Sequence, residues 1–357
     1  MEVRKELLPA EKRQAKPSDE NALGFGQIFT DHMLKIDYHD GQGWHNPRIV
    51  PYGPLELDPA ALVLHYGQEV FEGLKAYWGV DGDIHLFRPQ ANMERMLKSC
   101  ARLCIPEFPR DFLLEAIMEL VKIEQEWIPR SPGTSLYIRP TIIATEACLG
   151  VKVSSEYLLY VIVGPVGAYY AEGFSPTKIY VEEKYIRAAP GGLGEVKTSA
   201  NYAASLLAAE KAHHAGYTQV LWLDACDKKT IEEVGTSNAF FCIGDELITA
   251  PLDGSILPGV TRDSVIQLAR HWGITVNERR ITIDEVIAAQ ANGTLKEAFA
   301  TGTAAVISPV GTIAYQGAEH QVGDGQVGEL SKKLYDEIVG IQLGQRPDPF
   351  GWVVRIS

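Results

Sequence analysis

A stretch rich in glycine and proline divides the chain near its middle. It runs through Gly164-Pro-Val-Gly167 and Glu172-Gly-Phe-Ser-Pro176. Such residues interrupt regular structure and are typical of an interdomain link. A chain of 357 residues, 46% of them hydrophobic, is long enough to form two hydrophobic cores. The predicted parts are an N-terminal arm (1–22), a first domain (23–165), a link (166–177) and a second domain (178–357).

The first domain alternates strand hairpins with a pair of helices. Phe29–Tyr38 alternates apolar and polar residues, and Asp40–Gly43 follows it as a turn. Gly73–Trp78 and Ile84–Phe87 predict a second hairpin. Helical periodicity and further apolar runs complete the pattern, which is of the α+β class. The remaining predicted elements are helices from about residue 88 and over 111–125, and strands over 133–140 and 157–163.

The second domain is predicted to be rich in strands. Apolar residues recur at helical spacing after Lys197 until Gly216, a plausible end of a helix. Pro258–Arg262 precedes another helix, for which Thr261 is the N-cap candidate. The other predicted elements are strands over 218–224, 238–243 and 247–250, a strand and turn over 297–305, and a helix over about 327–343.

Lys197 is the first candidate for chemistry. It stands where a strand-like segment is expected to give way to a helix, after the small, turn-forming residues Ala188–Gly194. A lysine that is partly desolvated near another cation can lose its proton near neutral pH and attack a carbonyl. A solvated lysine at a helix start is the alternative interpretation.

Charge and composition exclude several classes of protein. The net charge of −13 disfavours binding to nucleic acid and to anionic membranes. Met1–Glu20 has no apolar core of a signal peptide, and the longest apolar run, Tyr157–Val163, is too short to span a membrane. The five cysteines are odd in number and scattered, which predicts neither a disulfide framework nor a metal site. We therefore expect a cytoplasmic protein.

Three segments offer groups suited to a charged ligand. Pro258–Thr261 and Thr301–Ala304 combine backbone N–H groups with hydroxyls, as phosphate sites do. Thr230–Asn238 places Glu232 and Glu233 before a Gly-Thr step. Each segment alone has an ordinary explanation, as a turn that binds nothing or as a pair of surface acids.

Taken together, seven segments resemble a branched-chain amino acid aminotransferase. They follow in order, with the spacing of that family, between about Gly24 and Trp352. The resemblance implies the two-domain pyridoxal-phosphate fold type IV, with a smaller N-terminal α/β domain and a larger, strand-rich C-terminal α/β domain, in a homodimer. The segments are Phe71–Ala76, Leu86–Arg95, Leu136–Pro140, Val196–Tyr202, Glu232–Thr236, Leu257–Arg262 and Gly302–Ala304.

The resemblance assigns roles to the residues around the pyridoxal phosphate. Lys197 holds the cofactor as a Schiff base and then carries the proton between the substrate Cα and the cofactor. Glu233 meets the pyridine nitrogen, Tyr202 donates to the phenolic oxygen, and Glu232 faces elsewhere. Arg88 is expected to be structural. The phosphate ligands implied are Arg95, Arg187, Thr236, Thr303 and backbone groups of Val260 and Thr261.

The implied substrates are leucine, isoleucine or valine and 2-oxoglutarate, in a ping-pong cycle. Arg139 binds the distal carboxylate of glutamate or 2-oxoglutarate, and the backbone at Thr303 and Ala304 binds the α-carboxylate. The implied apolar walls are Phe29, Phe71, Tyr137, Tyr169 and Tyr202, with Tyr66 and Val151 of the partner subunit.

Other members of the same fold remain alternatives. A D-amino acid aminotransferase is expected to carry an Arg-x-His pattern where this chain has Tyr137–Pro140, and an aminodeoxychorismate lyase is typically shorter. A catalytically silent scaffold would tend to lose Lys197 or Glu233. Mammalian relatives carry a Cys-x-x-Cys pair at the positions of Ala305 and Ser308, so no thiol switch is expected here.

Overall fold

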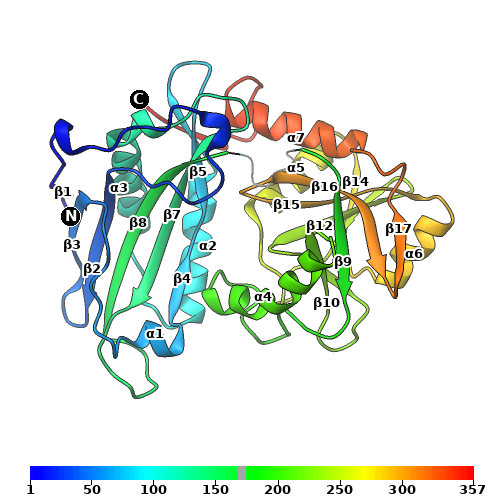
Figure 1. The fold of residues 1–357 in the computed structure, drawn as a ribbon, viewed down its shortest axis with the longest axis horizontal. Coiled ribbons are helices and arrows are strands. Elements are labelled where there is room, and N and C mark those ends of the chain that lie inside the picture. The colour runs from blue at the N-terminus through cyan, green and yellow to red at the C-terminus, as the bar shows by residue number, and fades with distance from the viewer. Residues whose placement is uncertain (168–173) are drawn as a thin grey trace. The chain divides into compact units, whose positions relative to one another are not determined.

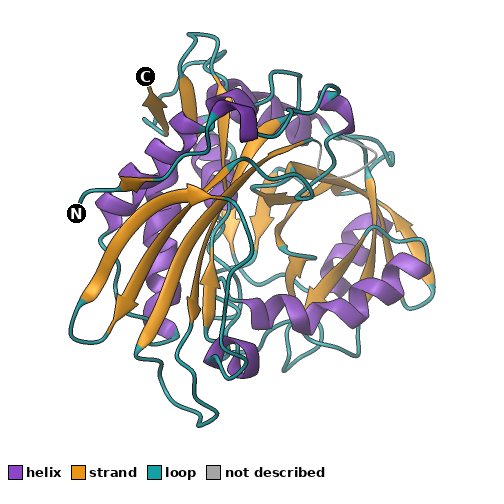
Figure 2. Ribbon diagram, turned by 60° about the vertical axis from the view of Figure 1, so that its left-hand side comes forward, coloured by secondary structure: helices purple, strands orange, loops and turns teal. Residues whose placement is uncertain are grey.

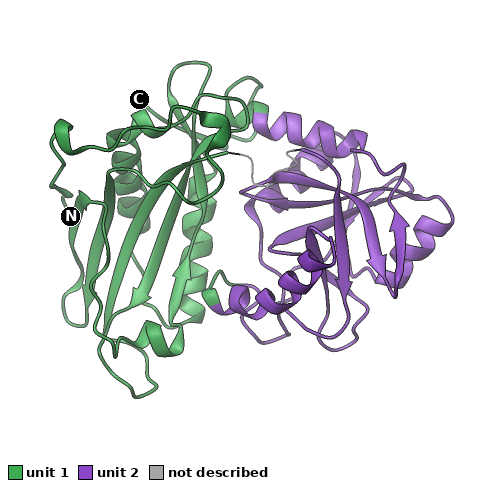
Figure 3. Cartoon of the chain, in the orientation of Figure 1, with its two compact units in different colours: residues 1–169, 196–199, 340–357 green, residues 170–195, 200–339 purple. Residues whose placement is uncertain are grey.

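The computed structural model describes residues 1–167 and 174–357, which form two compact units (Figure 3). The first unit consists of residues 1–169, 196–199 and 340–357, and the second of residues 170–195 and 200–339. Lys197 and the C-terminal segment therefore belong, by their contacts, to the first unit, although both lie beyond the predicted link. Half of that link, residues 168–173 with Tyr169 among them, lies outside the described residues.

The first unit is built on a nine-stranded sheet with the order β1-β3-β2-β8-β7-β5-β6-β18, in which β4 also pairs with β7 (Figure 1). The two predicted hairpins are confirmed as β2–β3 and β5–β6. The strands are β1 (Arg4–Lys5), β2 (His32–His39), β3 (Gly43–Pro51), β4 (Glu69–Phe71), β5 (Leu74–Trp78), β6 (Ile84–Phe87), β7 (Ser135–Ala144), β8 (Glu156–Val166) and β18 (Val353–Ile356).

Helices cover one face of this sheet (Figure 2). The buried side chains of α2 (Pro89–Arg102) include Met93 and Met96, which repeat at helical spacing as predicted. Together with the buried side chains of α3 (Arg110–Ile123) they form the core against the strands. The short helices of this unit are α1 (Leu62–Tyr66) and three 3₁₀ turns, Ala10–Lys12, Glu20–Ala22 and Gln125–Trp127.

The N-terminal arm lies along the surface of the first unit. The Leu8 amide donates to His32 Nε2 at 2.8 Å, and the Gln14 amide donates to Asp31 Oδ1 at 2.8 Å. The side chains of Asp31 and His32 are buried. The arm is therefore attached to the first unit by hydrogen bonds to a buried polar cluster.

In the second unit the strand order is β11-β10-β9-β16-β15-β12-β13-β14, with β17 paired to β16. Because β11 also pairs with β12, six of these strands form a closed ring. The strands are β9 (Thr177–Glu182), β10 (Gln219–Leu223), β11 (Ile231–Val234), β12 (Ser237–Ile243), β13 (Glu246–Thr249), β14 (Thr275–Glu278), β15 (Leu295–Gly302), β16 (Val306–Tyr315) and β17 (Ala318–Gln321).

The helices of the second part of the chain are α4 (Ser199–His214), α5 (Val260–His271), α6 (Ile283–Ala291) and α7 (Glu329–Gln342). Two local predictions were wrong. Thr261 lies inside the first turn of α5, because the extended residue Gly259 is its N-cap. Lys197 follows a series of turns instead of a strand. In the described part of the chain, no helix combines the length and apolar character that a membrane crossing requires.

Candidate active site

Lys197 is fixed through its backbone between β4 and α2 of the first unit. Its carbonyl accepts a hydrogen bond from the Phe71 amide at 3.1 Å, and its own amide donates to Ser99 Oγ at 3.0 Å. The next residue, Thr198, donates through Oγ1 to the Glu69 carbonyl at 2.7 Å. The Lys197 ammonium lies 4.9 Å from the centre of the Phe71 ring. These contacts hold the lysine just before α4 begins.

The Phe71 ring is shared by two cations of the first unit. Besides Lys197, the Arg139 guanidinium carbon lies 4.9 Å from the ring centre. Aromatic faces attract such cations. Arg139 also lies 5.2 Å from the centre of the Tyr137 ring, and its Nη2 donates to Tyr137 Oη at 3.2 Å. Tyr137 and Arg139, two residues apart on β7, share a face, and the structure places them with Phe71 and Lys197, so four candidate site residues lie in one group.

Glu72 is completely buried beside this group, and sequence reasoning missed it. Its carboxylate accepts hydrogen bonds from Arg95 Nε at 2.7 Å, Arg95 Nη2 at 2.8 Å, Asn92 Nδ2 at 2.8 Å and the Gly73 amide at 3.1 Å. Burial alone would raise the pKa of Glu72, but Arg95, the charge of Lys197 and the Asn92 amide lower it below its ordinary value. Glu72 is therefore a carboxylate that neutralises Arg95, the predicted phosphate ligand.

Gly73 permits the close approach of Tyr137. A Cβ at this position would lie 2.0 Å from Tyr137 Oη, so any side chain would displace the ring. Three consecutive residues thus organise this region: Phe71 contacts the cations, Glu72 binds Arg95, and Gly73 leaves room for Tyr137. Glu72 lies within the segment Phe71–Ala76 that carries the family resemblance, and this position was the sequence signal from which it could have been found.

The other predicted pocket residues of the first unit lie in more open positions. Phe29 stacks on Tyr52 with 5.1 Å between ring centres. The Tyr66 side chain is exposed and donates to the Leu149 carbonyl. Val151 is 82% exposed. Tyr66 and Val151 therefore have surface available for contact with another molecule.

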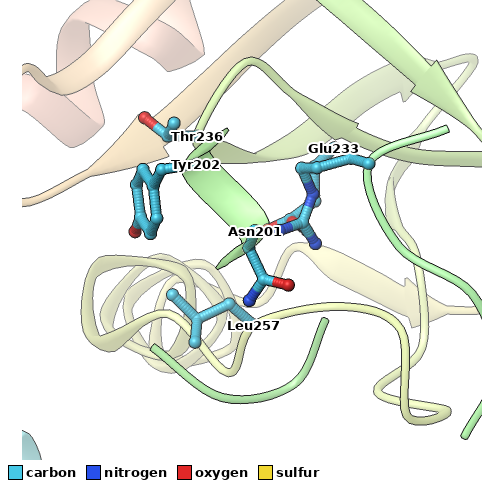
Figure 4. Close-up of a pocket in the computed structure, with 6 residues that line it drawn as sticks. Asn201, Tyr202, Glu233, Thr236 and Leu257 are labelled. Carbon is cyan, nitrogen blue, oxygen red and sulfur yellow. Dashed lines mark ion pairs between the residues drawn. The ribbon is translucent and has the colours of Figure 1, made fainter. Parts of the chain in front are cut away.

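The second unit contains an open pocket of about 240 Å³, with bulk space at its mouth included. Figure 4 shows Asn201, Tyr202, Glu233, Thr236 and Leu257 around it. Arg187 also lines the pocket and forms an ion pair with Glu233. Four predicted cofactor residues, Arg187, Tyr202, Glu233 and Thr236, are thus brought together.

Asn238 and Arg187 hold the Glu233 carboxylate in place. Asn238 Nδ2 donates to Glu233 Oε1 at 3.0 Å and to the Leu257 carbonyl at 2.8 Å. Arg187 Nη2 pairs with Glu233 and also donates to the Ser255 carbonyl at 2.9 Å. A carboxylate fixed in this way can face a cationic ring nitrogen. Asn238 is a further site neighbour that sequence reasoning missed, although it stands two residues after a recognised segment.

Two turns and a helix start meet at one end of the closed ring of strands. Asn238 pairs with Thr301 across β12 and β15, so the turn that holds Thr236 is near the turn that holds Thr303 and Ala304. Gly259, directly before Val260 and Thr261 of α5, packs against Asn238 so closely that a Cβ would lie 2.1 Å from its Oδ1. A helix N-terminus beside hydroxyl-bearing turns suits a phosphate group.

Known proteins are similar to this chain in both sequence and fold. The family model described as amino-transferase class IV matches residues 69–313. The chain belongs to the class IV aminotransferases. Branched-chain-amino-acid aminotransferase 2 of Bacillus subtilis is 54% identical to it over 99% of this chain and 97% of the relative. Branched-chain-amino-acid transaminase 1 of the same organism is 55% identical over 95% of each chain.

Solved structures of this class have the same fold. The branched-chain amino acid aminotransferase of Escherichia coli matches with a TM-score of 0.75 and 28% identity, over 91% of this chain and 100% of that one. The branched-chain amino acid aminotransferase of Thermobaculum terrenum, solved in its PLP form, matches with a TM-score of 0.75 and 25% identity, over 93% of this chain and 100% of that one. The predicted fold, pyridoxal-phosphate fold type IV, is confirmed.

Proposed function

We propose that this class IV aminotransferase moves an amino group reversibly between L-leucine, L-isoleucine or L-valine and 2-oxoglutarate. The observation that carries the proposal is 54% identity, over 99% of the chain, to a branched-chain-amino-acid aminotransferase. The site residues support it, because the chain retains an anchored lysine, Lys197, and a carboxylate held by an arginine, Glu233.

The cofactor of this proposal is pyridoxal 5'-phosphate. When bound, it supplies an aldehyde that condenses with amines and a ring that takes up the electrons released when the substrate Cα loses its proton. The residues of the second-unit pocket fit such a ring: Glu233 offers a fixed negative charge to its nitrogen, and Tyr202 offers a hydroxyl to its phenolic oxygen. The proposed phosphate ligands are Arg95, Arg187, Thr236, Thr303 and the backbone at Val260 and Thr261.

Lys197 performs two tasks in this proposal. With pyridoxal phosphate bound, Lys197 Nζ would hold the cofactor between turnovers and, once released, would carry the proton between the substrate Cα and the C4′ carbon of the cofactor. The Phe71 ring below the ammonium and the nearby charge of Glu72 restrict where Nζ can move. Removing Lys197 therefore removes both the anchor and the base.

The substrate side combines an apolar wall with one cation. Arg139, held against Phe71 and Tyr137, binds the distal carboxylate of glutamate or 2-oxoglutarate, while a branched side chain packs on the rings. The backbone at Thr303 and Ala304 binds the α-carboxylate. The remaining wall is Phe29, Tyr169 and Tyr202, closed in a homodimer by Tyr66 and Val151 of the partner subunit.

The absorption spectrum of the purified protein tests the proposal. After addition of pyridoxal phosphate, we expect a visible band that fades with L-leucine, is unchanged by D-alanine and returns with 2-oxoglutarate. A response to D-alanine alone would instead assign a D-amino acid aminotransferase. Absence of any band would contradict the cofactor assignment and favour the scaffold alternative.

A further inference from the structure

Glu232, the neighbour of Glu233 on β11, is a buried acid that no donor among the described residues meets with good hydrogen-bond geometry. Its side chain is 2% exposed, and neither carboxyl oxygen has a hydrogen-bond partner among the described residues. Successive strand residues point to opposite faces. Accordingly Glu233 lines the pocket and Glu232 does not. Ionising a buried carboxyl group that lacks hydrogen-bond donors costs a large free energy, so the neutral form is favoured.

Besides burial, four groups influence the ionisation of Glu232. They are the Ser255 hydroxyl and Arg187 from neighbouring loops, Glu233 from the same strand and Asp224 from the end of β10. Burial is the largest influence and raises the pKa of Glu232 to about 7, with Ser255 and Arg187 opposing the rise and the two acids adding to it. The Ser255 hydroxyl lies close enough to Glu232 to lower its pKa, and it donates a long hydrogen bond of 3.4 Å to Asp253 Oδ1.

Arg187 acts through its charge on Glu232 as well as on Glu233. Its Nη2 serves both Glu233 and the Ser255 carbonyl, whereas its Nε is buried and has no hydrogen-bond partner among the described residues. One guanidinium group therefore stands near two carboxyl groups and pairs with one of them. Three buried charges at this point would leave one acid unneutralised, and a proton on Glu232 removes that excess.

We propose that Glu232 is a positioning residue for Glu233. It keeps a proton while Arg187 is paired with Glu233. After losing that proton to water, it attracts the Arg187 guanidinium and so weakens the ion pair between Arg187 and Glu233. The inference rests on the proposed function. Both effects of the ionisation, the added negative charge and the weaker neutralisation of Glu233, favour a proton on the facing ring nitrogen. Glu232 therefore keeps this nitrogen protonated to higher pH than Glu233 alone would.

The test uses the holoenzyme and the variant Glu232→Gln, because glutamine has the shape of the protonated acid and cannot ionise. The visible absorption of bound pyridoxal phosphate is titrated from acid to alkaline pH, across the pKa of about 7. At the acid end the spectra of variant and wild type should coincide. At the alkaline end they should diverge, and the inflection near the Glu232 pKa should be missing from the variant.

Glu297→Gln is the matched control. Glu297 is also a carboxylate of the second unit, but it accepts hydrogen bonds from the amides of Leu330 and Ser331 at the start of α7. Its replacement should leave the inflection in place. Urea unfolding over the same pH range reports the ionisation of Glu232 independently of the cofactor.

The outcomes separate the possibilities. Coinciding titrations of wild type and Glu232→Gln would overturn the proposal, and so would a change in pH-dependent stability without any change in the spectra. If Glu232→Gln does not fold, Glu232→Asp takes its place, and an inflection at an unchanged pH would count against a role for this residue. Failure of wild-type protein to form a visible band at all would instead contradict the proposed function.

Discussion

The two units each bury a glutamate beside an arginine, yet the two acids are in opposite states. Glu72 in the first unit is fully buried and receives hydrogen bonds from Arg95, Asn92 and Gly73. Glu232 in the second unit is buried to nearly the same degree and receives none in the described structure. The pKa of the first is lowered and that of the second is raised to about 7. The hydrogen-bond donors around a buried acid, and not its degree of burial, therefore decide whether it is charged.

This difference separates a permanent charge from a conditional one. Glu72 fixes the plane of Arg95 through two parallel hydrogen bonds, a geometry that resists rotation. Glu232 changes charge near physiological pH, next to the acid proposed to face the cofactor ring. The buried acid of the first unit, Glu72, therefore keeps its negative charge, whereas the charge of Glu232 in the second unit changes with pH.

Replacing Lys197 has the largest expected effect. Lys197→Ala should reduce transamination by at least about a thousandfold, because both the anchor and the base are lost. Loss of the ammonium should also raise the pKa of Glu72, which the charge of Lys197 helps to lower. A coupled assay of leucine turnover measures activity, and circular dichroism measures folding. A folded variant that still consumed leucine at the wild-type rate would refute the assignment.

Replacing Glu72 should strongly destabilise the fold. Glu72→Gln leaves the Arg95 guanidinium buried without its countercharge, a change that typically costs about 3 to 5 kcal/mol. Urea unfolding at neutral pH measures the loss, with Glu232→Gln as the isosteric control in the other unit. Equal stabilities of the two variants would show that the contrast between these acids is not real.

Replacing Glu232 should stabilise the protein, but only at higher pH. Because its pKa is raised to about 7 from 4.5, the folded state binds more protons than the unfolded state between these values, and wild-type stability falls as pH rises through them. Glutamine does not titrate. The advantage of Glu232→Gln should therefore be near zero below the lower of these pKa values and reach up to about 3 kcal/mol above the higher one, as followed by urea unfolding. A constant difference across this range would contradict a neutral Glu232.

Replacing Arg139 should give the smallest effect and extends the comparison to the arginines of the first unit. Arg95 is neutralised by Glu72, whereas Arg139 packs on two aromatic rings and is proposed to meet a substrate charge. Arg139→Ala should lower kcat/KM for 2-oxoglutarate about tenfold more than for 4-methyl-2-oxopentanoate, because only 2-oxoglutarate carries the distal carboxylate. Equal losses for both substrates would assign Arg139 a structural role.

Local patterns predicted most elements of the first unit, because hairpins and amphipathic helices are encoded by neighbouring residues. The strand β18 was missed, since its only partner among the described strands, β6, is far away in sequence. Helix α6 was missed although Thr282 caps it through the Glu285 amide at 3.1 Å, because the helix is short.

The site was predictable only in part. Lys197 and Glu233 follow from recognisable segments of the sequence. The protonation states of Glu72 and Glu232 do not follow from the sequence. They depend on whether folding brings hydrogen-bond donors from distant positions, such as Arg95, next to each carboxyl group.

The pairing of β18 with β6 has a consequence for biosynthesis. Residues 353–356 leave the ribosome after the whole of the second unit, yet they complete the sheet of the first. While the chain is being translated, β6 remains an open edge, the kind of surface at which strands of other chains can pair. Folding of the N-terminal unit is thus finished from the C-terminal end, and an extension or truncation there acts on the part of the protein that was made first.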